Sequence, residues 1–285
     1  DGCEAFCTYC IVPYARGKSC STPPKEVIGS IKQLGRQGYH EVVLTGVHLG
    51  VYGMDLTPQT RLASLLADIH VSRGIDRVRL SSIEPGELTD EIIDRVAESD
   101  TFCHHLHIPL QSGDDTLLER MHRPYDRRLF RDVVSRVHGS VPDAAIGADV
   151  LVGFPGETEA AFENTWALIN ELPISYLHVF PFSARKGTPA SRYPDPIPVD
   201  AIRKRCNRIR LLGDEKKKAF YRQSVGKRVE IVIEGKAPGV EGFVRGVTSN
   251  YIPVLIPADN QPNRSMVQAR IDRADGSRQV FGTMC

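Results

Sequence analysis

The sequence of 285 residues has no apolar run that approaches the roughly 20 residues of a membrane-spanning helix. No signal peptide opens it, and internal repeats and low-complexity segments are absent. Its seven cysteines are odd in number, and three of them lie within the first ten residues, which argues against a disulfide framework and for metal ligation in a reducing compartment. With 41% hydrophobic and 25% charged residues, the composition is that of a globular protein, for which the cytoplasm is the default location.

The net charge of +1 conceals an uneven distribution along the chain. Residues 1–201 hold 19 Lys+Arg against 27 Asp+Glu, whereas residues 202–222 hold 9 against 2, and residues 223–285 hold 8 against 6. A mildly acidic body is therefore followed by a strongly basic segment. Such a segment is either a solvated helix face or a surface that attracts phosphates, and its position beside a small β-rich region favours the second interpretation.

Three cysteines stand at CxxxCxxC spacing in the opening loop: Cys3, Cys7 and Cys10. Three thiolates from one loop can each bind one iron of a 4Fe-4S cube and leave the fourth iron free to chelate a small molecule. Zinc takes thiolates as readily, but it would need a fourth ligand, for which the nearest candidates are Cys20 and His40. Purely structural thiols are a third alternative, which the turn-rich and polar loop disfavours. With Tyr9 before the last cysteine, the array resembles the signature of the radical S-adenosylmethionine (SAM) enzymes.

Strand-like and helix-like segments alternate after this loop. Short apolar runs predict strands at 41–45, 77–81, 104–110, 145–152 and 176–180, and apolar residues at helical spacing lie between them. This alternation predicts the α/β class, with parallel strands and helical crossovers in a partial, open βα barrel. In such barrels the chemistry lies at the carboxyl ends of the strands. A cluster loop should follow a strand of its own, and none precedes Cys3, so we expect a fragment that lacks its first strand.

The pattern changes after about residue 199. A basic helix runs to residue 222, and five short β segments with Gly and Pro between them follow. We therefore predict two domains, a core at 1–222 and a small all-β barrel at 223–285, a shape that often binds oligonucleotides. The expected phosphate-facing residues of the basic helix are Arg203, Lys204, Arg208, Lys216 and Lys217.

Several motifs, in order, resemble one family. They are Cys3–Gly17 (CEAFCTYCIVPYARG), 81–85 (SSIEP), 108–113 (IPLQSG), 149–158 (DVLVGFPGET), 180–183 (FPFS) and 187–190 (GTPA). Together they resemble the radical SAM methylthiotransferases over almost the whole chain. Residues 225–282, with Gly242 and Asn250-Tyr251, resemble the TRAM domain that ends those enzymes and binds tRNA. The stretch 44–50 (LTGVHLG) with Tyr52-Gly53 is similar to the branch that modifies N(6)-threonylcarbamoyladenosine beside the tRNA anticodon.

The resemblance implies a transferase with one 4Fe-4S cluster on Cys3, Cys7 and Cys10, and SAM as its second cofactor. An electron from a donor such as flavodoxin or ferredoxin cleaves SAM to methionine and a 5′-deoxyadenosyl radical. The radical removes hydrogen from carbon 2 of an adenine in the anticodon loop of tRNA, where a methylthio group is installed. Family members also carry an amino-terminal domain with three cysteines for an auxiliary cluster. Its ligands are absent here, so we do not expect this chain alone to complete methylthiolation.

The resemblance also suggests cofactor contacts. Tyr9 would pack near the adenine of SAM or cover the cluster, and Thr45-Gly46 ends a strand where the SAM amino group could approach the backbone. Glu84 and Gln111 follow strands and either hydrogen-bond SAM or substrate or serve as caps. The remaining positions in the matching motifs are Val152, Gly153, Gly156 and Arg185 for the cofactor, and Arg123 for the SAM carboxylate or an RNA phosphate. Tyr251 joins the basic helix as an RNA contact, and no residue is assigned as catalytic.

His104, His105 and His107 suggest a metal cluster at first sight. Alternating positions on a strand more often hold one core histidine with exposed neighbours, so we discount them as ligands. Two further functions remain open: the same chemistry on isopentenyladenosine in tRNA or on a ribosomal protein, and a non-enzymatic RNA-binding protein whose cysteines hold zinc.

Overall fold

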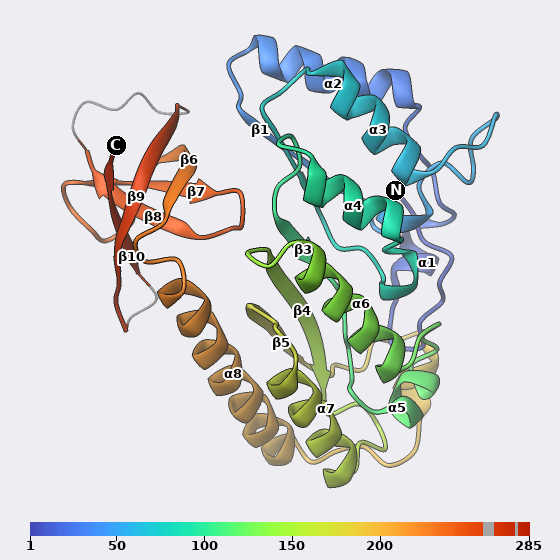
Figure 1. Cartoon of the computed structure of the whole chain (residues 1–285). Coiled ribbons are helices and arrows are strands. Elements are labelled where there is room, and N and C mark those ends of the chain that lie inside the picture. Colours follow the sequence, from blue (N-terminus) through green and yellow to red (C-terminus); the bar gives the residue numbers. More distant parts are fainter. Residues whose placement is uncertain (259–264, 277–278) are drawn as a thin grey trace.

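The computed structural model describes residues 1–258, 265–276 and 279–285 (Figure 1). The helices and strands of the first part are α1 (Val12–Arg16), α2 (Pro24–Arg36), β1 (Glu41–Leu44), α3 (Leu62–Ser72), β2 (Arg77–Leu80), α4 (Asp90–Glu98), β3 (His105–His107), α5 (Asp115–Arg120), α6 (Arg127–Ser140), β4 (Ala145–Val152), α7 (Glu159–Glu171), β5 (Tyr176–Pro181) and α8 (Val199–Arg222). Short 3-10 turns lie at Leu49–Val51, Pro85–Glu87 and Pro189–Arg192. Of the described residues, no helix is both long and apolar enough to cross a membrane.

The five strands of the first part are parallel and form a curved, open sheet. β1 pairs with β2, β3 pairs with β4, and β4 pairs with β5. A single bridge between Val78 and Phe102 joins the two halves. The expected partial βα barrel is therefore confirmed. The strand predicted at 104–110 is shorter than expected, although Ile108 and Leu110 beyond its end still donate to β4 carbonyls.

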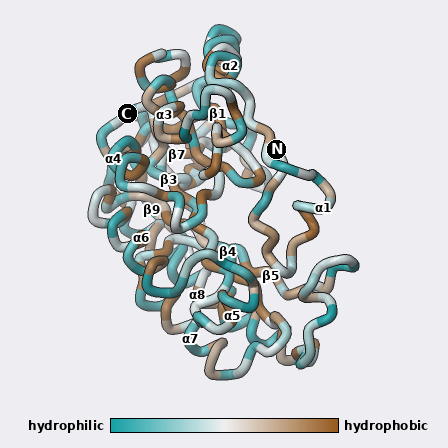
Figure 2. The backbone as a smooth tube through the Cα atoms, turned by 90° about the vertical axis from the view of Figure 1, so that its right-hand side faces the viewer, coloured by the Kyte–Doolittle hydropathy of each residue, from teal (hydrophilic) through white to brown (hydrophobic). Residues whose placement is uncertain are grey.

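The two faces of the sheet have different surroundings. On β4, Ile146, Ala148 and Val150 are completely buried in the core beneath the helices, whereas Asp149 on the opposite face is partly exposed. The period of two along a strand separates these faces. Figure 2 shows hydrophilic and hydrophobic residues alternating along the helices, as expected where one side of each helix packs on the sheet. The face without helices is therefore the interior of the partial barrel.

The second part is a closed barrel of five strands: β6 (Arg228–Lys236), β7 (Phe243–Thr248), β8 (Pro253–Pro257), β9 (Met266–Ala274) and β10 (Val280–Met284). Its core contains Ile231, Ile256 and Ile271, and Tyr221 at the end of α8 packs into it. Closure pairs each of these five strands on both sides, so the described residues of the small barrel contain no free strand edge. The predicted all-β barrel is confirmed.

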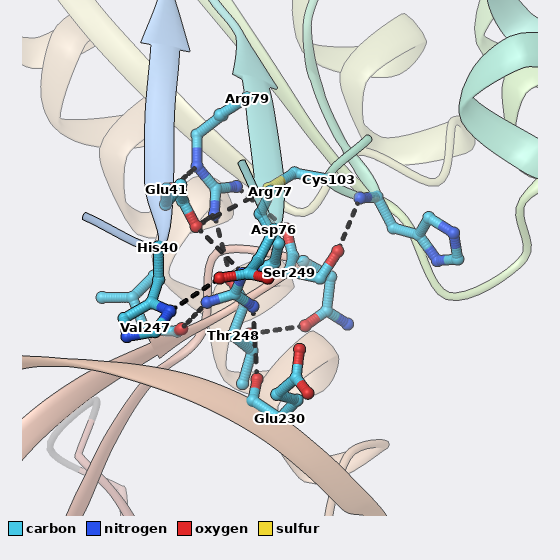
Figure 3. Close-up of polar contacts among 12 residues, drawn as sticks. His40, Glu41, Asp76, Arg77, Arg79, Cys103, Glu230, Val247, Thr248 and Ser249 are labelled. Atoms are coloured by element: carbon cyan, nitrogen blue, oxygen red, sulfur yellow. Dashed lines mark hydrogen bonds and ion pairs between the residues drawn. The ribbon is translucent and has the colours of Figure 1, made fainter. Parts of the chain in front are cut away.

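Two buried arginines on β2 join this barrel to the open sheet (Figure 3). Arg77 donates to the carbonyl oxygen of Val247, and Arg79 donates to those of Thr248 and Ser249, all within 3.1 Å. Both arginines also pair with Glu41, to which Arg79 donates two hydrogen bonds of 2.8 and 3.1 Å. The β7–β8 turn is thereby held at the amino-terminal ends of the sheet strands.

Candidate functional site

The opening loop is closed on itself. Cys3 N–H donates to the Gly17 carbonyl at 3.1 Å, and Cys20 N–H donates to the Asp1 carbonyl at 2.7 Å. Gly2 has φ 77°, and a Cβ there would lie 1.9 Å from the Lys18 carbonyl oxygen, so only glycine allows the two ends of the loop to approach this closely. The cysteine loop is therefore a preformed structure.

This loop lies over the carboxyl ends of the central strands. The Thr8 hydroxyl donates to the Arg120 carbonyl at 2.9 Å, and the Thr8 carbonyl accepts from the Ala190 N–H at 2.9 Å. Tyr9 packs with Leu151 and Phe182 against a small buried cluster. The predicted location of the cluster loop, at the carboxyl ends of parallel strands, is the location observed.

The thiols of Cys3, Cys7 and Cys10 are free, and Cys7 is buried. Burial raises the pKa of Cys3, and the nearby thiols of Cys7 and Cys10 raise it further. Burial likewise raises the pKa of Cys7, although Arg123 opposes this effect. A bound cation would stabilise the thiolates of Cys3 and Cys7, whose ionisation these surroundings disfavour. The donor set therefore fits the three-cysteine cluster expected from the sequence.

Arg123 lies directly beside this loop. Its side chain is only 4% exposed and donates to the Cys7 sulfur at 3.1 Å, while the Glu84 carboxylate forms an ion pair with it. Its Nε donates to the Tyr125 hydroxyl, which donates in turn to the Pro109 carbonyl. The structure thus places Arg123 and Glu84 together behind the cysteines. An RNA phosphate has no open route to a side chain this deeply buried.

His48 and Glu87 lie beside Cys3 and were not predicted. His48 Nδ1 lies 3.7 Å from the Cys3 sulfur, and its Nε2 lies 2.6 Å from a Glu87 carboxylate oxygen. This hydrogen bond raises the pKa of His48 against the effect of burial. Gly50 is needed here, because a Cβ would lie 2.0 Å from Glu87. His48 falls within the 44–50 motif, and this motif was the only feature of the sequence that could have indicated a role for His48.

The other predicted cofactor positions lie around the same strand ends. Thr45 and Gly46 directly follow β1 and line a cavity of about 120 Å³ beside Gly2. Gln111 follows β3 and has a left-handed backbone, with φ 60°. Two hydrogen bonds hold it: its N–H donates to the Asp149 carbonyl, and its carbonyl accepts from the Leu151 N–H. Non-glycine residues in this conformation are uncommon and cluster at functional sites, although helix ends such as Arg73 after α3 also adopt it.

The loop after β4 depends on two glycines. Gly153 and Gly156 have φ near 84°, and a Cβ on them would approach Ile202 to 2.4 Å and Arg120 to 2.8 Å. Both therefore shape this loop, as predicted from the motif. Val152 is 1% exposed and points into the helix-covered core, while its neighbour Leu151 packs against the same small cluster as Tyr9. Arg185 is exposed in the loop after β5.

The basic residues of α8 do not form one open surface. Arg208 pairs with Glu163 at 2.7 Å and Glu159 at 3.4 Å, and Arg203 pairs with Asp200 at 3.1 Å. Lys216 donates to the Leu172 and Asn170 carbonyls near the end of α7. Part of the positive charge that the sequence assigned to RNA thus attaches α8 to the body, because α7 presents acidic groups and free carbonyls to it.

Three other predicted RNA contacts remain accessible. Lys204 is exposed, and Lys217 lies 5.7 Å from the Tyr221 ring. Tyr251, with φ 62°, stacks on His105 at 4.6 Å between ring centroids. Lys217 and Tyr251 line a cavity of about 510 Å³ between β5, α8 and the small barrel, together with Arg210 and Arg245.

The histidine prediction was wrong in one respect. His105 and His107 are both 6% exposed, so β3 holds two buried histidines, because both face the interior of the barrel beside Tyr176. Burial lowers the pKa of His105 to about 3. The zinc alternative loses one proposed ligand, because His40 precedes β1 and pairs with Asp76 at 2.7 Å, at the opposite end of the strand from the cysteine loop.

Comparison with known proteins adds to this geometry. Residues 1–169 match the model of the Radical SAM superfamily. The chain is 40% identical over 277 residues to threonylcarbamoyladenosine tRNA methylthiotransferase MtaB of Bacillus subtilis (strain 168). It is 38% identical over 278 residues to tRNA-2-methylthio-N(6)-dimethylallyladenosine synthase of Clostridium botulinum (strain Okra / Type B1). Each alignment covers 96% of this chain and 61% of the relative, so the chain spans about three fifths of the length of these curated relatives.

Solved structures agree with the fold. The radical S-adenosylmethionine methyltransferase TsrM from Kitasatospora setae matches with a TM-score of 0.55 and 17% identity, over 66% of this chain and 37% of that one. Coproporphyrinogen III oxidase (HemN) from Escherichia coli matches with a TM-score of 0.51 and 14% identity, over 78% of this chain and 50% of that one. At this identity the likeness establishes the architecture of the open barrel only.

Proposed function

The chain belongs to the radical SAM superfamily, and on that premise we propose that it forms the SAM-cleaving and RNA-binding part of a tRNA methylthiotransferase. The proposed product carries a methylthio group on carbon 2 of N(6)-threonylcarbamoyladenosine beside the anticodon. The supporting observation is the three-cysteine loop, backed by Arg123 and located over the strand ends, in a chain similar along 96% of its length to the Bacillus subtilis threonylcarbamoyladenosine methylthiotransferase.

Membership of the family implies a 4Fe-4S cluster and SAM, which together supply a 5′-deoxyadenosyl radical for hydrogen abstraction. The protein's part is to hold and orient the cluster and SAM and to exclude water from them. Cys3, Cys7 and Cys10 would ligate the cluster, and the Arg123 guanidinium would stabilise the charge on the Cys7 sulfur. The apolar packing of Tyr9 with Leu151 and Phe182 would exclude water on one side.

We further propose that SAM lies among the loops that follow the strands. The residues proposed to contact it are Tyr9, Thr45, Gly46, Glu84, Gln111, Val152, Gly153, Gly156 and Arg185. Of these, Val152 would act through its backbone, because its side chain points away into the core. Glu84 would act mainly by orienting Arg123, with which it already pairs.

The division into residues 1–222 and 223–285 remains our proposal for the domains. We propose that tRNA contacts the face on which α8 meets the small barrel, through Lys204, Lys217 and Tyr251. A cation and an aromatic ring side by side are suited to a phosphate and an unstacked base. We place this activity in the cytoplasm, where the tRNA substrate and a flavodoxin or ferredoxin donor would be met.

The first test is anaerobic reconstitution of the chain with iron and sulfide, followed by SAM, dithionite and a 5′-deoxyadenosine assay. We expect product from the native chain and none from a Cys3→Ala, Cys7→Ala, Cys10→Ala variant. A Cys20→Ala variant is the matched control, because Cys20 is an exposed cysteine outside the triplet. A colourless protein that binds zinc instead, without 5′-deoxyadenosine, would refute the radical function.

The substrate is tested separately by restoring the chain within a full-length enzyme and analysing the nucleosides of tRNA. A second candidate, N(6)-dimethylallyladenosine, is favoured by the 38% identity to the Clostridium botulinum synthase. Methylthiolation of threonylcarbamoyladenosine alone supports the first candidate. Methylthiolation of dimethylallyladenosine alone supports the second and leaves the radical chemistry intact.

A further inference from the structure

A second group of ligating side chains lies inside the open barrel, away from the cysteines. It consists of His107 from β3, Asp149 from β4 and His178 from β5. Asp149 and His178 are direct partners in the β4–β5 ladder, and His107 pairs with Gly147, two residues before Asp149. The three side chains therefore project from neighbouring strands onto the same interior face.

The spacing of their ligand atoms matches a metal site. His107 Nε2 lies 3.0 Å and His178 Nδ1 lies 3.2 Å from the same Asp149 carboxylate oxygen. With metal–ligand bonds of about 2.1 Å, neighbouring ligands of a four- or six-coordinate ion lie roughly 3.0–3.4 Å apart. Small side-chain rotations would therefore let one ion replace the two contacts to Asp149.

The surroundings of His107 are built to hold it. Its other ring nitrogen, Nδ1, lies 3.1 Å from the Tyr176 hydroxyl, which lies 2.7 Å from His105 Nε2. The tyrosine crosses β4 at Gly147, where a Cβ would be 2.2 Å from its ring and 2.7 Å from His107 Nδ1. A metal-binding histidine typically has its second nitrogen held by such a partner. The glycine therefore makes room for a partner that orients His107.

The three side chains differ in exposure. The side chains of His107 and Asp149 are 7% and 22% exposed, whereas that of His178 is 54% exposed and lines the cavity of about 510 Å³. Solvent and small ligands can therefore reach the group from the cavity. Leu151, two residues beyond Asp149 on the same face, packs against the same buried cluster as Tyr9 of the cysteine loop. Along β4, the group thus lies roughly 7 Å deeper in the barrel than Leu151.

We propose that His107, Asp149 and His178 bind one divalent first-row transition-metal ion, distinct from the iron–sulfur cluster. Two imidazoles and one carboxylate on one face of the ion are a donor set that suits Fe²⁺, Co²⁺ or Zn²⁺ and leaves further positions open. Those positions face the cavity and are filled by water or by an oxygen donor of a molecule bound there. This inference holds whether or not the proposed tRNA substrate is correct.

The test uses the full chain with Cys3, Cys7 and Cys10 changed to serine, so that the cysteine loop does not compete for metal. Co²⁺ is titrated anaerobically and followed by its visible absorption, which separates nitrogen and oxygen ligation from thiolate ligation. We expect one equivalent bound with nitrogen and oxygen ligands. Asp149→Asn and His178→Gln should each weaken binding by more than about 10-fold, and Tyr176→Phe by about 10-fold.

His104→Gln is the matched control. His104 Nδ1 lies 3.2 Å from an Asp143 carboxylate oxygen, the same separation as in the His178–Asp149 pair, but without a second histidine. Cobalt affinity should be unchanged in this variant. The 54% exposure of His178 makes its glutamine variant the safest to fold, which circular dichroism checks. Absence of nitrogen–oxygen cobalt binding in the parent, or equal binding in all variants, would show that the three side chains form only hydrogen bonds.

Discussion

The Arg79 side chain provides a sharp test of how burial governs the strength of an ion pair. Arg79 is 4% exposed and donates two hydrogen bonds to Glu41, which is 17% exposed, and two more to the Thr248 and Ser249 carbonyls. Arg131 also donates two hydrogen bonds to a carboxylate, at 2.7 and 2.9 Å to Glu171, but these side chains are 34% and 51% exposed. Both are arginine–carboxylate pairs with two hydrogen bonds, and they differ in how far they are exposed to solvent.

Replacing Arg79 by alanine leaves the partly buried Glu41 with the 3.3 Å contact to Arg77 and a weak hydrogen bond from the Cys103 thiol at 3.7 Å. Breaking one partner of a buried pair costs about 3–5 kcal/mol, because the remaining charge stays desolvated. The Ser249 carbonyl also loses the Arg79 donor, at about 1–3 kcal/mol where water cannot replace it, whereas the Thr248 carbonyl keeps the Tyr251 N–H at 3.1 Å. These losses overlap, so we expect a loss of about 3–5 kcal/mol. Arg131→Ala should cost only about 0–1 kcal/mol.

Urea unfolding measures both values. The single tryptophan, Trp166 in α7, reports on the open barrel by fluorescence, while circular dichroism reports on the whole chain. In Arg79→Ala we expect a lower urea midpoint by both probes, with a separate early transition by circular dichroism if the small barrel detaches. Losses below about 1 kcal/mol and equal to that of Arg131→Ala would refute the argument that this junction depends on burial.

Three further outcomes are expected. Arg123→Met should lower the iron retained after reconstitution, since Cys7 loses its cationic partner; iron per chain measures this. Lys204→Glu should weaken tRNA binding and reduce the salt dependence of that binding by about one counterion. By contrast, Lys216→Gln should lower the unfolding midpoint, because the hydrogen bonds of Lys216 attach α8 to the end of α7. A hydrogen bond with His104 lowers the pKa of Asp143. The contribution of Asp143 to stability is therefore complete above pH ~3.8 and is lost as pH falls through the lowered pKa. Thermal melting of the native chain and of Asp143→Asn at several pH values tests this.

Each of these has a clear contrary result. Unchanged iron content in Arg123→Met would show that the arginine does not support the cysteines. A salt dependence unaffected by Lys204→Glu would place the RNA elsewhere. A stability difference between the native chain and Asp143→Asn that grows on acidification would have the wrong sign for a carboxyl group of lowered pKa.

Local sequence was sufficient for the cysteine loop and for most of the fold. Three cysteines within eight residues must share one loop, and Gly2 permits its closure. Strand and helix periodicity were likewise readable, because burial of one helix face and alternation along a strand act over a few neighbouring residues. Strand 145–152 has the bounds expected of it. The strand expected at 104–110 proved too long by several residues, and those expected at 41–45 and 77–81 by one residue each.

The tertiary structure decided which distant side chains meet. Arg123 contacts Cys7 across 116 positions, and Arg79 reaches the Ser249 carbonyl across 170. His107, Asp149 and His178 come from three strands and share a face only because of the strand register. Sequence spacing carries no information about such partners, since they depend on how the chain returns to the same place. The sequence therefore determined the kind of chemistry, and the packing of remote segments decided its surroundings.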